Sequence, residues 1–125
     1  MNPIDYIIVA LKIIVSLSIL NVWLIQPNKP TKWRGGKAKN IFEEFEVYGL
    51  SKLLCYTIGF FKVSLALILF ASIQFTALSL IGSLGLSILL IGSIGMHLKI
   101  KDPLYKSFPA FLFTLMNLVI AYLSL

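Results

Sequence analysis

Two lysines lie inside long apolar stretches of this chain of 125 residues, Lys12 in the first stretch and Lys62 in the second. A charged lysine at the centre of a membrane costs about 2.5 to 3.5 kcal/mol on insertion scales, so two of them require an explanation. One interpretation is an electropositive pocket that holds a carboxylate, a phosphate or the polar head of a ligand. The alternatives are a side chain that extends to the membrane surface and a lysine that stays neutral. The pocket is favoured more strongly for Lys62 than for Lys12.

Four other polar residues are candidates for the same pocket. Glu43 and Glu44 begin a short amphipathic segment, where they are either solvated or turned inward toward a buried lysine. Asn117 lies on the small-residue face of the last apolar stretch, and such a face is typical of a bundle interior. His97, near the end of the third stretch, is either a structural residue at the membrane surface or a proton relay and hydrogen-bond donor. We therefore expect a ligand site formed by Lys62, Lys12, Glu43, Glu44, Asn117 and His97.

The pattern contains no evident catalytic groups. The single cysteine, Cys55, excludes an intramolecular disulfide and a CxxC redox pair. The single histidine belongs to no recognisable Ser-His-Asp arrangement or metal-ligand cluster. We expect no catalytic residues and no metal ligands, and the sequence does not favour catalytic activity of the chain on its own.

The elements that must position these residues are transmembrane helices. Hydrophobic residues make up 58% of the chain and charged residues 13%, which is more apolar surface than a soluble domain of this size can bury. A bilayer core of about 30 Å requires about 20 apolar residues in a helix. The chain offers four such segments, at about residues 4–25, 53–73, 77–98 and 104–125. Transmembrane strands would alternate apolar and polar residues, which these segments do not. The sequence predicts an all-α membrane protein, a four-helix transmembrane bundle that forms a single domain over residues 1–125.

The first loop is predicted to contain a further helix. Residues 26–39 include two prolines and two glycines and are typical of irregular chain. Asn40 then has the form of a helix cap with Glu43 three residues later, and Gly49 can end the helix. The sequence therefore predicts a short amphipathic helix over about residues 40–48, on the membrane surface or in the mouth of the bundle.

Two expectations concern depth and the last span. At 1.5 Å per residue, Lys12 lies about 12 Å from the start of the first span and Lys62 about 14 Å from the start of the second. We therefore expect the two lysines within about one helical turn of the same height.

In the last span, Asp102 is predicted to cap the helix and Pro109 to bend its first turns.

Basic residues are unevenly distributed among the connections between spans. The two basic connections contain Lys29, Lys32, Arg34, Lys37, Lys39 and Lys52, and Lys99, Lys101 and Lys106; the turn near Gln74 has no charge. Because lysine and arginine collect in cytoplasmic loops, we expect both basic connections inside and both termini outside. The net charge of +6 then indicates topology in a multi-pass protein of the cell membrane, the cytoplasmic membrane if the source is bacterial, and no nucleic-acid partner is expected.

Several short motifs occur in order along the chain. They are Trp33-Arg34-Gly35-Gly36-Lys37-Ala38-Lys39-Asn40, Glu43-Glu44-Phe45, Tyr48-Gly49-Leu50, Gly59-x-x-Lys62 with Ala66, His97 with Lys101-Asp102-Pro103, and Pro109-Ala110. Together they resemble the DoxX-like family of small four-span membrane proteins, over nearly the whole chain. The resemblance implies the same four-helix architecture. It also implies a function tied to membrane redox work, because some relatives are membrane subunits of thiosulfate:quinone oxidoreductase and others associate with redox enzymes.

Two functions are consistent with these patterns. In the first, the chain is a non-catalytic membrane module that binds a small amphiphile, a quinone or a lipid, or docks a membrane redox protein, through a polar interior around Lys62. In the second, it is a membrane subunit of a quinone-linked electron-transfer oxidoreductase, or a small transporter. We favour the first, because the pattern contains a pocket but no reactive groups. The expected partners are the lipid bilayer, a redox protein and further copies of the chain; no covalent cofactor is expected, and quinone is the candidate ligand.

Overall fold

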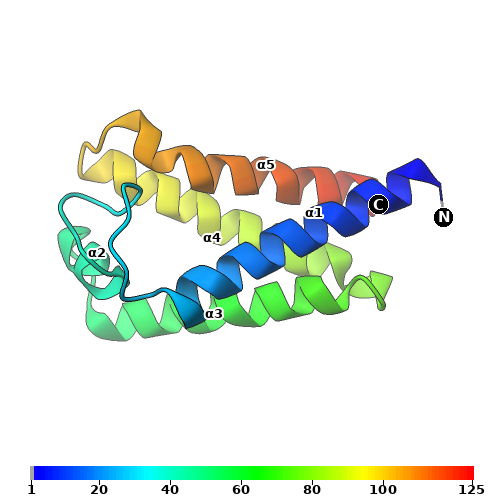
Figure 1. Ribbon diagram of the computed structural model, residues 1–125, viewed down its shortest axis with the longest axis horizontal. Helices are drawn as coiled ribbons and strands as arrows, with labels where there is room; N and C mark the ends of the chain where they lie inside the picture. Colours follow the sequence, from blue (N-terminus) through cyan, green and yellow to red (C-terminus); the bar gives the residue numbers. More distant parts are fainter. Residues whose placement is uncertain (1) are drawn as a thin grey trace.

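The computed structural model describes residues 2–125 as a set of helices with one longer loop (Figure 1). In chain order the elements are α1 (Pro3–Leu20), a π-helical turn (Asn21–Ile25), α2 (Ile41–Val47), α3 (Lys52–Ala71), a 3-10 turn (Thr76–Leu78), α4 (Ser79–Lys99), a second 3-10 turn (Leu104–Ser107) and α5 (Phe108–Leu123). The residues that the structure describes contain no strand. The predicted all-α class is therefore confirmed.

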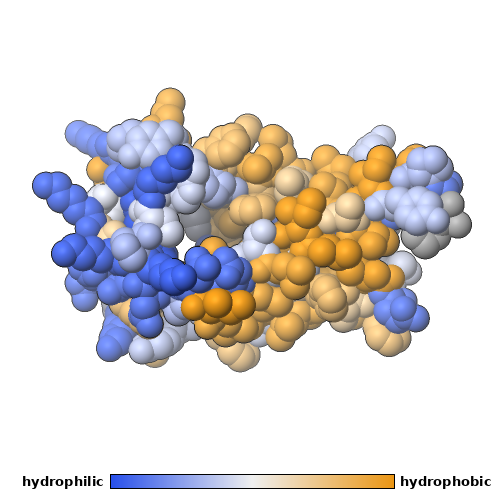
Figure 2. Space-filling model, viewed as in Figure 1, coloured by the Kyte–Doolittle hydropathy of each residue, from blue (hydrophilic) through white to orange (hydrophobic). Residues whose placement is uncertain are grey.

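Four helical segments are long and apolar enough to cross a bilayer. They are Pro3–Ile25, Lys52–Ala71, Thr76–Lys99 and Leu104–Leu123. Large hydrophobic side chains lie exposed along them, with Ile88 at 71% and Phe60 at 67%, which suits a surface in contact with lipid. Figure 2 shows this hydrophobic band between two more hydrophilic ends of the molecule. These observations confirm the predicted four-helix transmembrane bundle.

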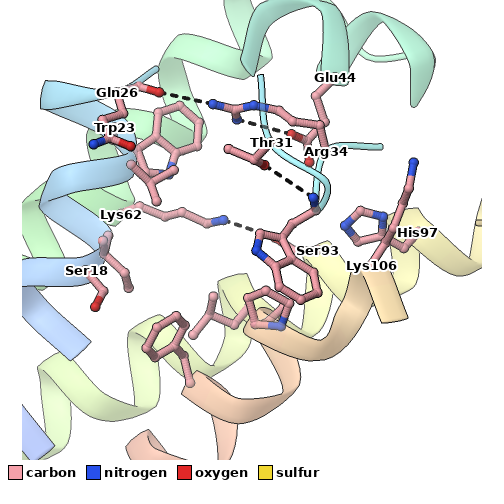
Figure 3. A pocket seen from close by; sticks show the side chains of 17 residues that line it. Ser18, Trp23, Gln26, Thr31, Arg34, Glu44, Lys62, Ser93, His97 and Lys106 are labelled. Carbon is pink, nitrogen blue, oxygen red and sulfur yellow. Dashed lines mark hydrogen bonds and ion pairs between the residues drawn. The ribbon is translucent and has the colours of Figure 1, made fainter. Parts of the chain in front are cut away.

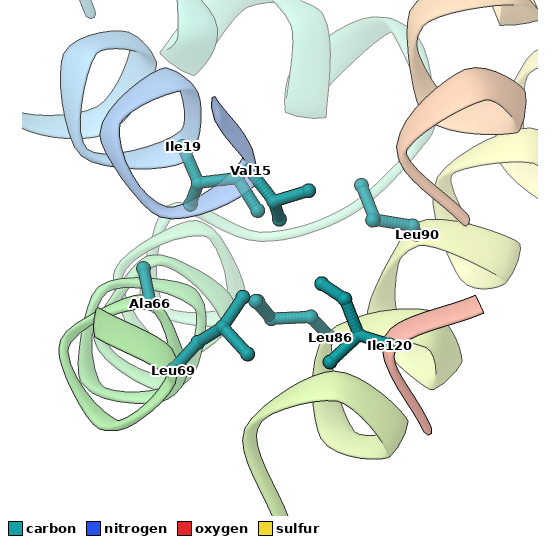
Figure 4. Close-up of a cluster of buried hydrophobic side chains, with 7 residues drawn as sticks. All are labelled: Val15, Ile19, Ala66, Leu69, Leu86, Leu90 and Ile120. Carbon is teal, nitrogen blue, oxygen red and sulfur yellow. The ribbon is translucent and has the colours of Figure 1, made fainter. Parts of the chain in front are cut away.

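The bundle packs around one buried cluster. Helix α4 lies between α3 and α5, and α1 contacts both α3 and α5 from the other side. Both termini lie at one end of the molecule and α2 lies at the other (Figure 1). The side chains that meet at the centre are aliphatic, and each is at most 6% exposed: Val15, Ile19, Ala66, Leu69, Leu86, Leu90 and Ile120 (Figure 4).

Glycine allows α3 and α4 to approach closely. A Cβ atom on Gly82 would lie 3.0 Å from the backbone of Leu69, so a larger residue would require the two helices to move apart slightly. One helical turn further along, a Cβ on Gly85 would lie 2.8 Å from the Leu65 side chain. Such small residues at helix contacts are typical of membrane bundles, where backbones gain dispersion contacts by coming close.

The loop helix forms as the sequence predicts. The Asn40 side chain accepts a hydrogen bond from the backbone N–H of Glu43, so the cap is in place. Gly49 has φ +80°, the left-handed conformation in which glycine commonly follows a helix. On the inner face, Ile41 and Phe45 are buried against α3. Helix α2 therefore covers the end of the bundle.

The start of the last span differs from the prediction. Residues 104–107 form a separate 3-10 turn, and α5 begins at Phe108 with Pro109 in its first turn. Proline is tolerated there because the first N–H groups of a helix have no partner within it, so Pro109 lies where the 3-10 turn passes into α5. The Asp102 side chain caps no helix; it bonds to His97 and to the backbone N–H of Gly36. The expected cap was wrong because stronger donors are available to Asp102.

The expected common depth of the two lysines was also wrong. Lys12 donates hydrogen bonds to the carbonyl of Ser72, 3.0 Å away, and to the hydroxyl of Ser79, 2.8 Å away, at the turn between α3 and α4. Ser72 lies ten residues beyond Lys62 on the same helix, which is about 15 Å along its axis. The error arose from treating the helix ends as level, because α3 continues past the end of α1 toward α2.

Candidate functional site

Two adjoining cavities lie beneath the first loop, at the α2 end of the bundle. The inner cavity, of about 210 Å³, lies between α1, α4, α5 and the loop. The lateral groove, of about 340 Å³, lies between α3 and α4 and is covered by α2. The residues that line both are Val22, Trp23, Arg34, Glu44, Lys62 and Ser93. The face in Figure 2 is hollowed where the hydrophilic loop end meets the hydrophobic band.

The π-helical turn at the end of α1 places Trp23 in the shared wall. The backbone N–H of Gln26 bonds to the carbonyl of Asn21, which widens the last turn. The Trp23 ring lies over Gly59, where a Cβ would be 2.6 Å from the ring, and it packs edge-on against Phe45 at 6.0 Å. π-helical turns often occur at functional sites, and this one brings an indole beneath the loop helix.

Lys62 is the buried cation of the site. It is 8% exposed, and its ammonium donates a hydrogen bond to the Ser93 hydroxyl at 3.0 Å. Its Nζ atom also lies 5.6 Å from the centre of the Trp23 ring, within the range of a cation–π contact. Among residues 2–125, no carboxylate forms an ion pair with Lys62. Figure 3 shows its side chain pointing across the cavity toward Ser93.

Arg34 holds the loop over the cavity. Its guanidinium donates to the backbone carbonyls of Gln26, Pro27 and Lys29 and forms an ion pair with Glu44 at 3.3 Å. The side chain is buried, at 6% exposure. One residue thus satisfies three carbonyls of irregular chain and fixes a carboxylate of α2, so the roof of the cavity is an ordered part of the molecule.

A chain of hydrogen-bonded side chains runs from the roof to the end of α4. The Tyr48 hydroxyl donates to Glu44 at 2.6 Å and lies 3.3 Å from Nε2 of His97. Nδ1 of His97 lies 2.7 Å from the Asp102 carboxylate. Glu44 and His97 both line the inner cavity, so the chain connects two points of its wall through Tyr48.

The Tyr48 hydroxyl lies between the other two side chains of this network. Burial, and after it the Glu44 carboxylate, raises the pKa of Tyr48 well above its usual range, so the phenol stays neutral. Because a hydroxyl both donates and accepts, Tyr48 connects Glu44 to His97 by hydrogen bonds.

The structure brings three of the six expected site residues together. Lys62, Glu44 and His97 line the inner cavity. Lys12 lies at the opposite end, at the turn after α3. Glu43 accepts a hydrogen bond from Asn40, and Asn117 is buried on α5 and bonds to the carbonyl of Phe113. The lining of both cavities includes neither Glu43 nor Asn117.

Sequence reasoning missed several residues of the site. They are Trp23, Arg34, Tyr48, Ser93 and Asp102. For Asp102 a signal was present, since an acid five residues after a histidine at a helix end can fold back onto its ring. For Tyr48 no such signal exists, because its spacing from Ile41 and Phe45 is typical of an apolar helix face and does not indicate a role for its hydroxyl.

The fold and the site define a multi-pass helical membrane protein with a polar cavity at one end. The DoxX-like family matches residues 34–122, and the chain belongs to that family. The matched region begins at Arg34 of the roof and includes Lys62, His97 and Asp102. The searches of curated proteins and of solved structures gave no significant match.

Proposed function

We propose that this protein is a non-catalytic module that binds a membrane amphiphile, with the polar head of the ligand at Lys62. The observation that supports the proposal is the unpaired charge of Lys62. Its ammonium has three donors, and one bond to Ser93 leaves two without a protein acceptor among the described residues. A buried charge is costly unless it is paired and hydrogen-bonded, and a ligand oxygen at this position would satisfy both requirements.

The charge of the surrounding side chains favours an oxyanion as the head of the ligand. Arg34 is paired with Glu44, and Asp102 is paired with His97 and lies 3.9 Å from Lys106. Lys62 is then the cation of the cavity that has no acid partner. A carboxylate or phosphate would neutralise it, whereas a quinone carbonyl would accept a hydrogen bond without neutralising it.

The walls of the cavities suit an amphiphile. Apart from the polar groups described, the lateral groove is lined by aliphatic and aromatic side chains, and its volume is at the lower end of the range of about 300 to 1,000 Å³ for small-molecule sites. A few polar groups fix the orientation of a ligand in such a site, and the apolar walls supply contact area.

The first test compares two lysine variants. Wild type, Lys62→Met and the matched control Lys12→Met are purified in native-lipid discs, and the bound molecules are identified by mass spectrometry. We expect one stoichiometric amphiphile in wild type and in Lys12→Met, and a loss of about tenfold or more in Lys62→Met, since a tenfold change corresponds to about 1.4 kcal/mol. Equal retention in all three proteins would contradict the proposal.

A second candidate function is a membrane subunit of a quinone-linked oxidoreductase. The hydrogen-bonded side chains of Glu44, Tyr48 and His97 favour it. Quinone reduction takes up protons, and these side chains can move a proton to the cavity wall. The electrons would come from a partner redox protein. This candidate requires that a purified complex lose activity when this protein is omitted. A complex that is fully active without the protein would exclude the candidate.

We also propose that the α2 end faces the cytoplasm, in the cell membrane. The loop beneath which the cavity lies contains five basic residues, Lys29, Lys32, Arg34, Lys37 and Lys39, and the link between α4 and α5 at the same end adds Lys101 and Lys106. Basic loops stay on the cytoplasmic side. Both termini would then lie on the outer side.

A further inference from the structure

The lateral groove exists because α3 and α4 separate toward the α2 end. The two helices touch at Gly82 and Gly85, where an added Cβ would meet α3 within about 3 Å. Two turns later, a Cβ on Gly92 would meet nothing within 4 Å. At this height the helices are joined by the hydrogen bond from Lys62 to Ser93. The separation therefore opens a gap whose inner end is Lys62.

The groove is apolar and reaches the lipid-facing surface. Leu54 and Ile58 form its α3 wall, and Ile88, Leu89 and Met96 form its α4 wall. At its mouth Ile88 is 71% exposed and Leu54 is 37% exposed, so these side chains meet the bilayer directly. The groove thus runs from the hydrocarbon of the membrane to a buried cation.

We infer that the lateral groove admits the hydrocarbon chain of an anionic membrane lipid from the bilayer, while the lipid headgroup pairs with Lys62. This inference rests on the proposed function and adds the route and the class of ligand. Charge complementarity selects the lipid, because Lys62 has no acid partner among the described residues. The oxyanion of the headgroup would pair with Lys62, and the attached hydrocarbon chain would contact the apolar walls of the groove. Helix α2 covers the groove at the end of the bundle, so the hydrocarbon chain of the lipid would leave sideways between α3 and α4.

The test uses Gly92 and Gly95 as a matched pair. Both glycines have open space where a Cβ would lie, but only Gly92 lines the groove. Gly92→Phe would fill the groove without a clash at Cβ, and Gly95→Phe adds the same ring outside it. The probe is phosphatidylglycerol with a photoreactive diazirine in the middle of one acyl chain, in discs of phosphatidylcholine.

We expect crosslinks in wild type to Leu54, Ile58, Ile88 or Met96. Gly92→Phe should reduce them by about tenfold or more, the effect of losing roughly 1.4 kcal/mol of binding free energy, and Gly95→Phe should leave them unchanged. Wild-type crosslinks confined to other faces of the bundle, or equal crosslinking in both variants, would overturn the inference. The wild-type map decides the question even if Gly92→Phe does not fold.

A short-chain probe separates this inference from the proposed function. Dihexanoyl phosphatidylglycerol has the same headgroup but chains too short to extend along the groove. Binding that depends on Lys62 and survives in Gly92→Phe, together with loss of the long-chain lipid, supports the lateral route. If the binding of both lipids depends on Lys62 and Gly92→Phe weakens neither, the headgroup site at Lys62 is supported and the lateral route is overturned. If neither lipid depends on Lys62, or a quinone displaces the lipid from it, the anionic-lipid assignment fails.

Discussion

The two buried lysines of this protein differ in their hydrogen-bond partners. Lys12 donates to the carbonyl of Ser72 and the hydroxyl of Ser79, so it closes the C-terminal end of α3, where a cation also interacts favourably with the helix dipole. Lys62 has one hydroxyl partner. Each lysine lines a cavity, Lys62 at the α2 end and Lys12 at the other end, so what separates them is the number of protein acceptors. The same residue type at a similar position in two spans therefore has a structural role in one place and the properties of a binding group in the other.

Lys12→Met is expected to lower the free energy of unfolding by about 1 to 3 kcal/mol, because two buried acceptors lose their donor. Reversible unfolding in mixed detergent micelles, followed by circular dichroism, measures the change. Lys62→Met serves as the comparison, since it removes an uncompensated buried charge and should cost less or even stabilise the protein. Equal destabilisation by both variants would show that the two environments do not differ in this way.

The lysines and His97 could be identified from the sequence because charged or titratable residues are rare in membrane spans. Their partners could not. Tyr48 and His97 are 49 residues apart, and Gly36 and Asp102 are 66 apart. Contacts of this kind depend on how an irregular loop folds back over the bundle, and no periodicity in the sequence specifies that path.

At the scale of elements, the loop from Gln26 to Leu50 is held to the bundle by the apolar face of α2 and by polar contacts. Asp102 accepts from the backbone N–H of Gly36, Lys106 donates to the carbonyl of Gly36, and Lys99 donates to the carbonyl of Tyr48. The spans were predictable because bilayer thickness sets their length. The π-helical turn and the 3-10 turns were not, because they depend on small differences between alternative backbone hydrogen bonds.

The burial of Tyr48 predicts a dependence of stability on alkaline pH. Its ordinary pKa is 10.0, and the folded environment raises it. Above about pH 10 the unfolded state therefore releases a proton that the folded state keeps, so stability falls as pH rises, by at most about 1.4 kcal/mol per pH unit. Tyr48→Phe should reduce this slope in unfolding measurements between about pH 9 and pH 12.

The control for this measurement is Tyr122→Phe, which removes a phenol that is 74% exposed. The effect of Tyr48 is the difference in slope between the two variants. A Tyr48→Phe protein with the wild-type slope would indicate that the phenol titrates normally in the folded state.

At the scale of the whole molecule, the two ends differ in chemistry. The α2 end gathers the basic loop and the cavity, while the other end contains the termini and a turn without charge (Figures 1 and 2). The fold class and the number of spans followed from composition. The offset between α1 and α3 did not. It is marked by the contact of Trp23 with Gly59, which a count of residues along each span cannot reveal.

The proposed orientation predicts which side chains a membrane-impermeant maleimide reaches in intact cells. In a Cys55→Ser background, a cysteine in place of Leu125, which is 89% exposed, should be labelled from outside. Lys37→Cys, in the exposed loop, should be labelled only after the cells are permeabilised. The opposite pattern would place the cavity end on the outer side.

The partners of Lys12 also constrain the order of biogenesis. The lysine is synthesised in the first span, whereas Ser72 and Ser79 follow it by 60 and 67 residues. During synthesis the first span therefore enters the membrane while its ammonium lacks the groups that later satisfy it, at a cost of about 2.5 to 3.5 kcal/mol on insertion scales. We therefore expect the first helix to be held in its final place only after the turn between α3 and α4 has been synthesised.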